Sequence, residues 1–414
     1  MPKLKTDRSD KARIPRAVYV ISGTVFVLGT SEFGIAGLLP EISTELSVSL
    51  PRAGLLISVY AIAMVIGAPV LTVLTLRMPH RATLLAALAL FVAGQVLGAL
   101  AADYSVLLVA RVVTAVATGT FWAVAAAVVV SLVDPANRAR ALSLQMGGLT
   151  VANVLGVPLG TLVGQQFGWR ATFWVIGAAA ATATVGIALA VAGSTHRRAA
   201  PVGLRVELEA FTSGRLWLTL GIVAVFQTAV IGCFSYLAPL ISEVAELPTG
   251  WVPAALALFG IGSLIGVQLG GRLSDAHPAG TVYFGLSAIA VALLAIVAGG
   301  SLAPVALAAT LVLGVAAFAG AAALNARVFT LGIAAPRLVG AVSASAFNVG
   351  ATLGPWLGGL TISAGLGFRS PSAVGLALIA VATVLSLLFR ALDHRTANAE
   401  EPVPADAQGA DTFG

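Results

Sequence analysis

Charged residues are scarce in this 414-residue chain: they make up 10% of the sequence, whereas hydrophobic residues make up 58%. The mean hydropathy is +0.99. A water-soluble protein needs many charged side chains on its surface, and a chain this apolar cannot bury its side chains in soluble cores. The composition therefore excludes a soluble protein and predicts one that is embedded in a lipid bilayer.

Cysteine and histidine are also scarce. The single cysteine, Cys233, lies in an apolar stretch and has no second cysteine in the chain with which to form a disulfide. The four histidines, His80, His196, His277 and His394, all fall in predicted loops, and no H-E-x-x-H motif occurs. The sequence thus argues against a membrane metalloenzyme, and we expect no metal site and no cofactor.

Apolar stretches recur along the whole chain, with short polar or Pro/Gly-containing connections between them. Each has about the 20 residues that a helix needs to span a bilayer. We therefore predict an all-α polytopic membrane protein with about twelve transmembrane helices. The approximate ranges are 17–40, 52–76, 82–101, 105–132, 139–165, 170–193, 215–241, 250–271, 280–300, 302–327, 338–365 and 371–391.

Most lysine and arginine residues fall on one side of this topology, in the N-terminal segment 1–16, the linker 194–214 and the short loops on the same side. The positive-inside rule then places both termini in the cytoplasm. The sequence pI of about 10 reflects this topology and anionic lipid headgroups, and it does not indicate nucleic acid binding. We predict that the Ala-, Pro- and acid-rich tail, 392–414, is disordered.

An internal repeat divides the chain into two six-helix halves, 17–193 and 215–391. "LLPEI" at 38–42 aligns with "LAPLI" at 237–241, and other weak matches occur at nearly the same offset. Two pseudo-symmetric halves around a central site form a common architecture for transport by alternating access.

Two ionisable residues lie inside predicted spans. Glu32 interrupts the apolar run "LGTSEFGIAGLLP", and Arg111 lies in the fourth span. A charge at the centre of a spanning helix costs about 2.5–3.5 kcal/mol, so these groups should face a water-filled cavity or each other. Burial disfavours the charged carboxylate and a nearby arginine favours it, so movement or hydration would change its affinity for a proton. We interpret Glu32 as a proton carrier with Arg111 as its partner; the alternative is a structural ion pair.

The motifs around these two residues resemble those of a known family. "GTSEFGIAGLLPEI" at 29–42 and "LLVARVVTAVATGTFWAVAAA" at 107–127 are similar to the first-span and fourth-span motifs of twelve-span drug:proton antiporters in the major facilitator superfamily. The nearest resemblance is to bacterial chloramphenicol and arabinose-efflux-type exporters. It implies protonation at Glu32, an embedded arginine at Arg111, protons as the coupling ion, and export of a small hydrophobic compound such as chloramphenicol.

Small residues form ridges in spans five and eleven. "QMGGLTVANVLGVPLGTLVG" at 145–164 resembles the family's antiporter motif, and "GATLGPWLGG" at 350–359 repeats its pattern. Ridges of this kind let helices approach closely, which is also ordinary membrane packing, and proline bends a helix. The expected packing residues are Gly156, Pro158, Gly160, Gly164, Gly350, Gly354, Pro355 and Gly358.

The family's cytoplasmic gating loop is altered in the first half. "TVLTLRMPHR" at 72–81 has Leu76 where the family has Asp, whereas "GGRLSDAHP" in the second half keeps the motif. We expect the first-half loop to rely on arginines that bind other partners, such as helix C-termini. The predicted gating residues are Arg77, Arg81, Gly271 and Asp275.

A cavity with apolar walls and few polar groups is expected to bind a moderately hydrophobic molecule. The candidate lining residues are Phe33, Trp122, Asn153, Phe226, Gln227, Phe234, Tyr236 and Asn325. Arg327, near the end of span ten, is interpreted as a residue that extends to the membrane interface.

Other functions remain open at this stage. An exporter of a sugar or a nucleoside, and a membrane sensor that binds without transporting, are both compatible with the sequence. A channel is disfavoured because no ring of charges or repeated filter is evident. We expect a monomer in the bacterial cytoplasmic membrane whose partners are a small-molecule substrate, protons and lipid.

Overall fold

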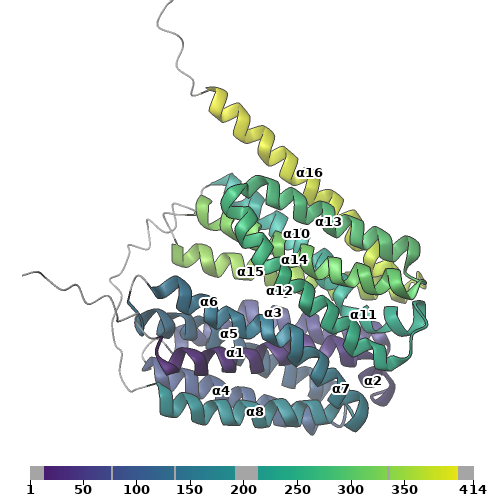
Figure 1. The fold of residues 1–414 in the computed structure, drawn as a ribbon. Coiled ribbons are helices and arrows are strands. Elements are labelled where there is room, and N and C mark those ends of the chain that lie inside the picture. Colours follow the sequence, from purple (N-terminus) through teal and green to yellow (C-terminus); the bar gives the residue numbers. More distant parts are fainter. Residues whose placement is uncertain (1–13, 76–77, 135–136, 192–212, 333–335, 400–414) are drawn as a thin grey trace, which may run out of the picture.

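A computed structural model describes residues 14–75, 78–134, 137–191, 213–332 and 336–399, and the regular elements in these ranges are all helices (Figure 1). The predicted all-α class is confirmed. Most of the proposed N-terminal segment, 1–16, and most of the linker, 194–214, lie outside the described residues; Arg16 is the first residue of α1.

The first half contains six membrane-length helical segments, of which the first and fifth are interrupted. Its elements are α1 (Arg16–Gly34), η1 (Ile35–Leu38), α2 (Leu39–Glu45), α3 (Leu50–Leu74), α4 (His80–Ala99), α5 (Tyr104–Ser131), α6 (Arg138–Val151), η3 (Ala152–Gly156), α7 (Val157–Phe167) and α8 (Trp169–Ala190).

The second half repeats this plan, with its first segment broken in a similar place. Its elements are α10 (Gly214–Ser235), α11 (Leu237–Pro239), η5 (Leu240–Val244), η6 (Thr249–Trp251), α12 (Val252–Ala276), α13 (Pro278–Gly299), α14 (Ala303–Leu331), α15 (Pro336–Ser363) and α16 (Ser370–Ala399).

Local sequence explains where several helices begin. Asp103 is the N-cap of α5, and its carboxylate accepts hydrogen bonds from the backbone N–H groups of Ser105 and Val106 at 2.8 and 3.0 Å. Proline occupies the first turn of α12, α13 and α14, where its missing N–H is not needed. Gly168, with a φ of 84°, makes the sharp turn between α7 and α8.

Eleven helices within the described residues are long and apolar enough to cross a membrane. The remaining predicted span corresponds to α15, which has comparable length but is not among the eleven. Its glycines, serines and Asn348 make it less apolar than the other long helices. The twelve-helix plan of the sequence therefore appears in the fold.

Three predictions about segments between and after the spans need correction. Residues 392–399 were expected in a disordered tail, but they continue α16, because the sequence has no proline or glycine until Pro402 to end the helix. Gly271 and Asp275, predicted in a loop, lie in the last turns of α12, and Arg81 lies in the first turn of α4. Gly214 belongs to α10 and not to the linker.

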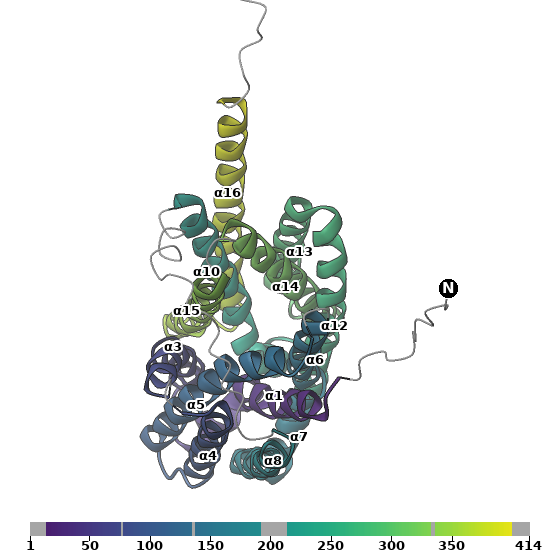
Figure 2. The same cartoon turned by 90° about the vertical axis from the view of Figure 1, so that its left-hand side faces the viewer.

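The two halves pack side by side with a reciprocal pairing of helices. The second segment of the first half, α3, packs against the fifth segment of the other half, α15. The fifth segment of the first half, η3 and α7, packs against the second segment of the other half, α12. Figure 2 shows α3 beside α15, and it shows α6, which precedes η3 in the same segment, beside α12. This exchange is what a two-fold axis between two similar halves produces, as the internal repeat predicts.

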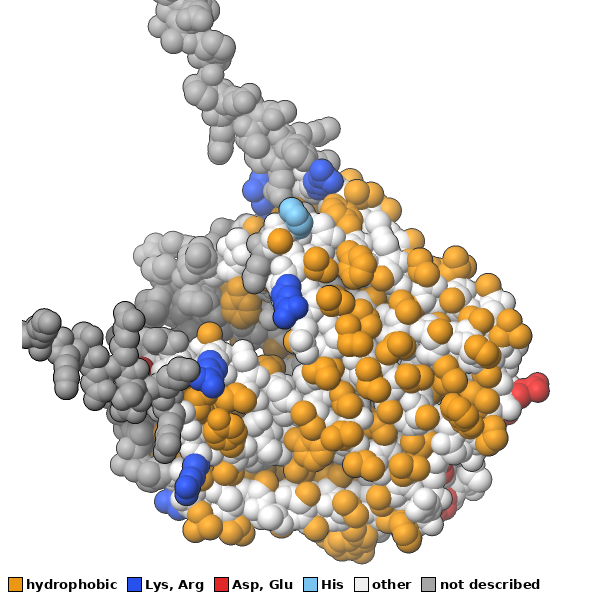
Figure 3. All heavy atoms as spheres, in the orientation of Figure 1, with side chains coloured by type: hydrophobic (Ala, Val, Ile, Leu, Met, Phe, Trp, Pro, Cys, Tyr) orange, Lys and Arg blue, Asp and Glu red, His pale blue; other side chains and the backbone are white. Residues whose placement is uncertain are grey.

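Charges divide between the two ends of the bundle. Figure 3 shows arginine side chains toward one end, acidic side chains at the other, and a hydrophobic belt between them. The basic end carries the exposed Arg16, Arg138, Arg140, Arg272 and Arg390, and the opposite end carries the exposed Glu45, Asp103, Glu243 and Glu246. A hydrophobic belt between polar ends fits a bilayer.

Candidate functional site

Glu32 lies in the last turn of α1, at a cavity between the two halves. The space between the side chains of this central cavity, including space open to solvent, is about 370 Å³. It is lined by Glu32, Phe33, Ala36, Ile57, Tyr60, Ala61, Ile231, Phe234, Asn348 and Ala351. The first six come from the first half and the last four from the second half, so the carboxylate faces a space that both halves enclose.

The end of α1 is defined by a change in helix type. The tighter turn η1 follows Gly34, and Gly37 lies so close to α12 that a Cβ there would be 2.7 Å from Leu256 Cδ1. Carbonyl groups in the last turn of an α-helix lack the usual helical partner and carry partial negative charge. The carbonyls of Ser31 and Glu32 are therefore available to a cation.

Arg111 uses these carbonyls. Its side chain, 1% exposed, donates from Nη1 to the Ser31 backbone oxygen at 2.9 Å and from Nη2 to the Glu32 backbone oxygen at 3.4 Å. In the part of the chain that the structure describes, no salt bridge joins Arg111 to the Glu32 carboxylate. Glu32 thus lies at a cavity, which is one of the two expected arrangements, whereas Arg111 binds the backbone of α1, which the sequence analysis did not predict.

Tyr60 of α3 connects Arg111 to the cavity wall. The Arg111 guanidinium carbon lies 4.0 Å from the centre of the Tyr60 ring, which is a cation–π arrangement. The Tyr60 hydroxyl donates to Thr118 Oγ1 of α5 at 2.8 Å, and the ring also lines the central cavity. Sequence analysis missed Tyr60, since a tyrosine in an apolar span is too common to indicate a site.

Aromatic rings form much of the rest of the wall. The rings of Phe33 and Phe234 meet edge to face, with centroids 6.3 Å apart across the two halves. Phe234 also packs on Phe259 at 4.6 Å. These contacts place two predicted cavity residues, Phe33 and Phe234, at the cavity.

Asn348 of α15 is the amide in the lining, and it was not among the predicted candidates. Its Nδ2 donates to the backbone oxygen of Ala344, one turn earlier in α15, at 3.0 Å. The Oδ1 atom is then the part of the amide that can accept a hydrogen bond from a bound molecule. A polar residue in an apolar span was the signal that could have identified it.

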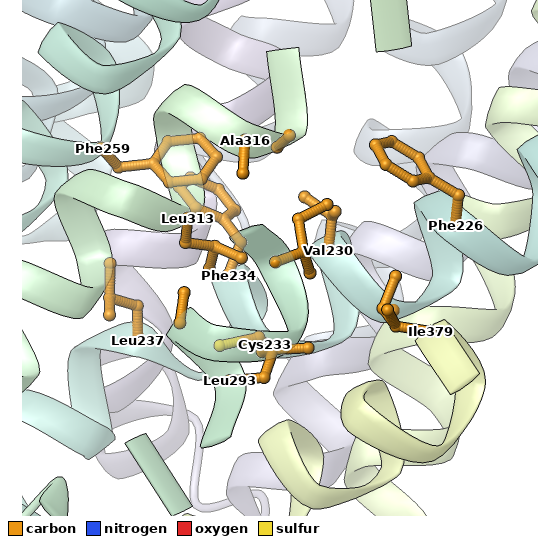
Figure 4. Packing of buried hydrophobic residues seen from close by; sticks show 14 of the residues in the cluster. Phe226, Val230, Cys233, Phe234, Leu237, Phe259, Leu293, Leu313, Ala316 and Ile379 are labelled. Carbon is orange, nitrogen blue, oxygen red and sulfur yellow. The ribbon is translucent and has the colours of Figure 1, made fainter. Parts of the chain in front are cut away.

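Four predicted cavity residues lie elsewhere because they pack within one half. Phe226 is 1% exposed and belongs to the core of the second half, where Figure 4 shows it apart from Phe234 and Phe259. Trp122 packs against the core of the first half. Gln227 packs with its Cβ against α15, and Asn325 accepts a hydrogen bond from Ser343 at 2.9 Å.

The other two predicted cavity residues lie at contacts between the halves. Asn153 is 3% exposed in η3, and a Cβ on Gly260 of α12 would lie 2.6 Å from its backbone carbon. Tyr236 donates to the Pro355 carbonyl at 2.8 Å and packs against Gly54 of α3. Both residues help to join the halves, and neither is among the residues that line the central cavity.

The two small-residue ridges are helix contacts. In the first half, Gly156 lies against Thr30 of α1, Gly160 against Thr172 of α8, and Gly164 against Thr172 and Leu38. Pro158 follows the π-helical segment η3, where the regular backbone bonding is already interrupted.

The second ridge packs α15 against α10. A Cβ on Gly350 would lie 2.5 Å from the Ala224 carbonyl oxygen, and one on Gly354 would lie 2.6 Å from the Gly232 nitrogen. Gly358 faces the Tyr236 ring, and Pro355 lies inside the helix. These glycines therefore allow backbone-to-backbone contact.

The predicted gating residues show a contact within one half. Arg81 donates from Nη2 to the carbonyl of Ala188, in the last turn of α8, at 2.5 Å. This is the kind of partner, a helix C-terminus, that the sequence predicts for it. Arg77 lies outside the described residues.

Arg327 stacks on the Phe389 ring of α16 at 3.4 Å.

Contacts at the opposite end hold the halves together there. Gln165 of α7 donates to the carbonyl of Thr249 at 3.1 Å, which links the first half to the second. Within the first half, Arg170 forms a salt bridge with Glu45 and also donates to the Ala101 carbonyl. The Gln165–Thr249 hydrogen bond and the contacts of α11 with η1 and α2 therefore bring the two halves together at this end.

The family assignment follows from comparison with known proteins. The model of the Major Facilitator Superfamily matches residues 21–344. The chain belongs to this superfamily. It is 40% identical over 268 residues to a chloramphenicol resistance protein of Streptomyces lividans, covering 64% of this chain and 68% of that protein.

Further matches cover most of the chain. The inner membrane transport protein YdhP of Escherichia coli K12 is 34% identical over 366 residues, which cover 87% of this chain and 92% of YdhP. A crystal structure of a bacterial homologue of the human lysosomal transporter Spinster, inward-facing and occupied, matches with a TM-score of 0.72 at 17% identity. That match covers 92% of this chain and 97% of the other. The chain is thus a multi-pass membrane transporter of this superfamily, and the predicted family is confirmed.

Proposed function

We propose that the protein exports a small, largely apolar compound in exchange for protons, with chloramphenicol or a related phenicol as the first candidate. The observation that carries the proposal is the position of Glu32, a carboxylate on a cavity that both halves enclose, beside the buried Arg111. Intramembrane carboxylates in such cavities commonly carry protons.

The cavity wall supports an apolar substrate. Aromatic and aliphatic side chains surround two groups that can bind polar parts of a ligand, Glu32 and Asn348. No cluster of basic side chains lines the cavity, which disfavours anions such as sugar phosphates. The 40% identity to a chloramphenicol resistance protein favours phenicols among apolar compounds.

The orientation is part of the proposal. Arginines gather at the basic end, so the positive-inside rule puts that end in the cytoplasm and the Gln165–Thr249 contact on the outer side. The cavity then receives its substrate from the cytoplasm in this conformation.

One proton moving inward supplies about 2.3 kcal/mol per 100 mV of potential and about 1.4 kcal/mol per pH unit. Together they support a gradient of several hundred-fold.

The test is growth of a pump-deficient bacterium that expresses the chain, across a panel of phenicols and other hydrophobic antibiotics, with and without a protonophore. We expect resistance to at least one compound, and we expect the protonophore to abolish it. The Glu32→Gln variant should reach the membrane and confer no resistance, whereas Glu243→Gln, an exposed acid at the opposite end, should behave as the wild type.

The outcome that contradicts this proposal is also specific. Full resistance in Glu32→Gln, or resistance that persists with the protonophore, would rule out proton exchange at Glu32. No resistance to any compound, with the protein verified in the membrane, would instead favour the sugar or nucleoside exporter.

A further inference from the structure

A second cavity lies inside the first half, on the other side of α1 from the central cavity. We call it the rear chamber; the space between its side chains, including space open to solvent, is about 250 Å³. It is lined by Thr30, Ser31, Gly34, Ile35, Leu38, Gln95, Arg111, Thr172, Phe173 and Ile176. All ten residues are buried, and they come from α1, η1, α4, α5 and α8 of the same half. The rear chamber is thus separate from the space between the halves.

Two polar atoms at the rear chamber have no hydrogen-bond partner among the residues that the structure describes. They are Nε of Arg111, a donor, and Oε1 of Gln95, an acceptor. Both side chains are 1% exposed. The other end of the Gln95 amide is used, since its Nε2 donates to Ser31 Oγ at 2.6 Å. Buried polar atoms in proteins are nearly always paired, with protein or with an internal water.

Water is the ligand that matches this pair. A single water molecule can accept a hydrogen bond from Arg111 Nε and donate one to Gln95 Oε1. An anion would satisfy the arginine and oppose the amide oxygen, and an apolar molecule would satisfy neither. The part of the chamber that a water-sized sphere can enter is about 10 Å³, which is room for about one water molecule and too little for a substrate.

We propose that the rear chamber binds water between Arg111 and Gln95, and that Gln95 is a positioning residue for Arg111. Through this water and through Ser31, Gln95 holds the guanidinium on the backbone of α1 and away from the Glu32 carboxylate. The inference rests on the proposed role of Glu32 as the proton carrier. Gln95 touches neither the central cavity nor the substrate, and it acts on the proton site only through Arg111.

The position of Arg111 matters because few other charges act on Glu32. The titratable or charged groups that line the two cavities are Glu32 of α1, Tyr60 of α3 and Arg111 of α5. The residues that α4, α8, α10 and α15 contribute to the two linings are uncharged. If the Arg111 guanidinium moves toward the Glu32 carboxylate, the ionised form of that carboxylate is favoured. If another group neutralises the guanidinium, the ionised form is favoured less.

The experiment measures the pH at which proton-driven export is half-maximal, in membrane vesicles with chloramphenicol as the substrate. Gln95→Leu removes the acceptor and the bond to Ser31, so Arg111 turns toward Glu32. We expect the midpoint to fall by about one pH unit. Gln95→Glu gives Arg111 a counter-charge of its own, so we expect the midpoint to rise by about one pH unit.

Opposite shifts are a result that loss of packing would not produce. Thr172→Val is the matched control, because Thr172 lines the rear chamber but its hydroxyl already donates to the Gly160 carbonyl at 2.8 Å. Its midpoint should not move. If Gln95→Leu fails to reach the membrane, Gln95→Met tests the same downward shift with a side chain of similar length.

Two results would overturn the inference: midpoints of both Gln95 variants that equal the wild type, or midpoints that move in the same direction. A high-resolution density map with no water beside Arg111 Nε would also overturn it. Failure of the proposed function looks different, since the Glu32→Gln variant would then keep the pH dependence of the wild type.

Discussion

Arg111 binds the backbone of α1 more closely than it binds the acid of α1. Its guanidinium donates to the carbonyls of Ser31 and Glu32 and stacks on Tyr60. A helix C-terminus is a favourable place for a cation, so the charge is stabilised without a direct ion pair. Within the described residues no ion pair joins the Glu32 carboxylate to Arg111, and the proposed exchange of a proton at Glu32 needs no such pair to break.

This arrangement predicts that charge alone will not replace Arg111. Arg111→Lys keeps the positive charge but loses the planar group that binds two carbonyls and a ring, so export should fall by about tenfold or more while the protein is still inserted. The measurement is the initial rate of protonophore-sensitive chloramphenicol export. Arg138→Lys, an exposed arginine at the basic end, is the control and should export normally. Equal rates in the two variants would show that the geometry around Arg111 is unimportant.

The site residues divide into those that sequence could reveal and those that it could not. Glu32 and Arg111 are evident because a charge in an apolar span is costly and rare. Gln95 is a polar residue in an apolar span and Tyr60 carries no such signal, but the roles of both depend on contacts with residues 64 and 51 positions away, Ser31 and Arg111. Phe226 was predicted at the cavity and lies in a core, since periodicity along α10 does not say which neighbour each face meets.

At the scale of elements, the helices that must approach most closely carry glycine at the contact. α15 and α10 meet backbone to backbone at Gly354, where a Cβ would lie 2.6 Å from the Gly232 nitrogen and 2.7 Å from the Thr228 carbonyl oxygen. Backbone atoms cannot move aside as a flexible side chain can. The ridge of span eleven is thus a close packing contact between α15 and α10 in this conformation.

Gly354→Ala should destabilise the protein by about 1–3 kcal/mol, because the added methyl group overpacks this contact. We expect a melting temperature several degrees below the wild type in detergent. Gly221→Ala, on α10 at a position with nothing within 4 Å of the new Cβ, should leave the melting temperature unchanged or slightly raised. A Gly354→Ala protein that melts with the wild type would contradict the close contact of α10 and α15.

The sequence predicts where the helices lie better than it predicts the residues at which they end. The sequence places the twelve spans, but it puts Gly271 and Asp275 in a loop that α12 has absorbed. The reason is physical, because these residues do not break a helix once neighbouring turns have formed. The connection between α12 and α13 therefore consists of His277 alone. The π-helical segments η3 and η5 are likewise outside what apolar periodicity can show.

For the whole molecule, composition and the internal repeat predict two similar halves, and the reciprocal pairing of α3 with α15 and of α7 with α12 agrees with them. Which end of the cavity is closed could not be predicted. That closure depends on contacts between residues far apart in sequence, such as Gln165 with Thr249. The charge asymmetry predicts the orientation of the bundle but not its conformation.

The orientation predicts how cysteines label in intact bacterial cells. Glu243→Cys, at the opposite end, should react with a membrane-impermeant maleimide added outside, and Ala139→Cys, at the basic end, should react only after the membrane is opened. The native Cys233 is 2% exposed and should not react in either case. Labelling of Ala139→Cys in intact cells would place the basic end outside the cell.

The central claim is that substrate and proton exchange through Glu32, and the most direct measurement follows protons in proteoliposomes. With a pH-sensitive dye inside and a drug gradient imposed across the membrane, substrate leaving the vesicles should drive protons in, and the internal pH should fall. Glu32→Gln should abolish this proton movement, and Glu243→Gln should keep it. Substrate-driven proton movement that persists in Glu32→Gln would contradict the account.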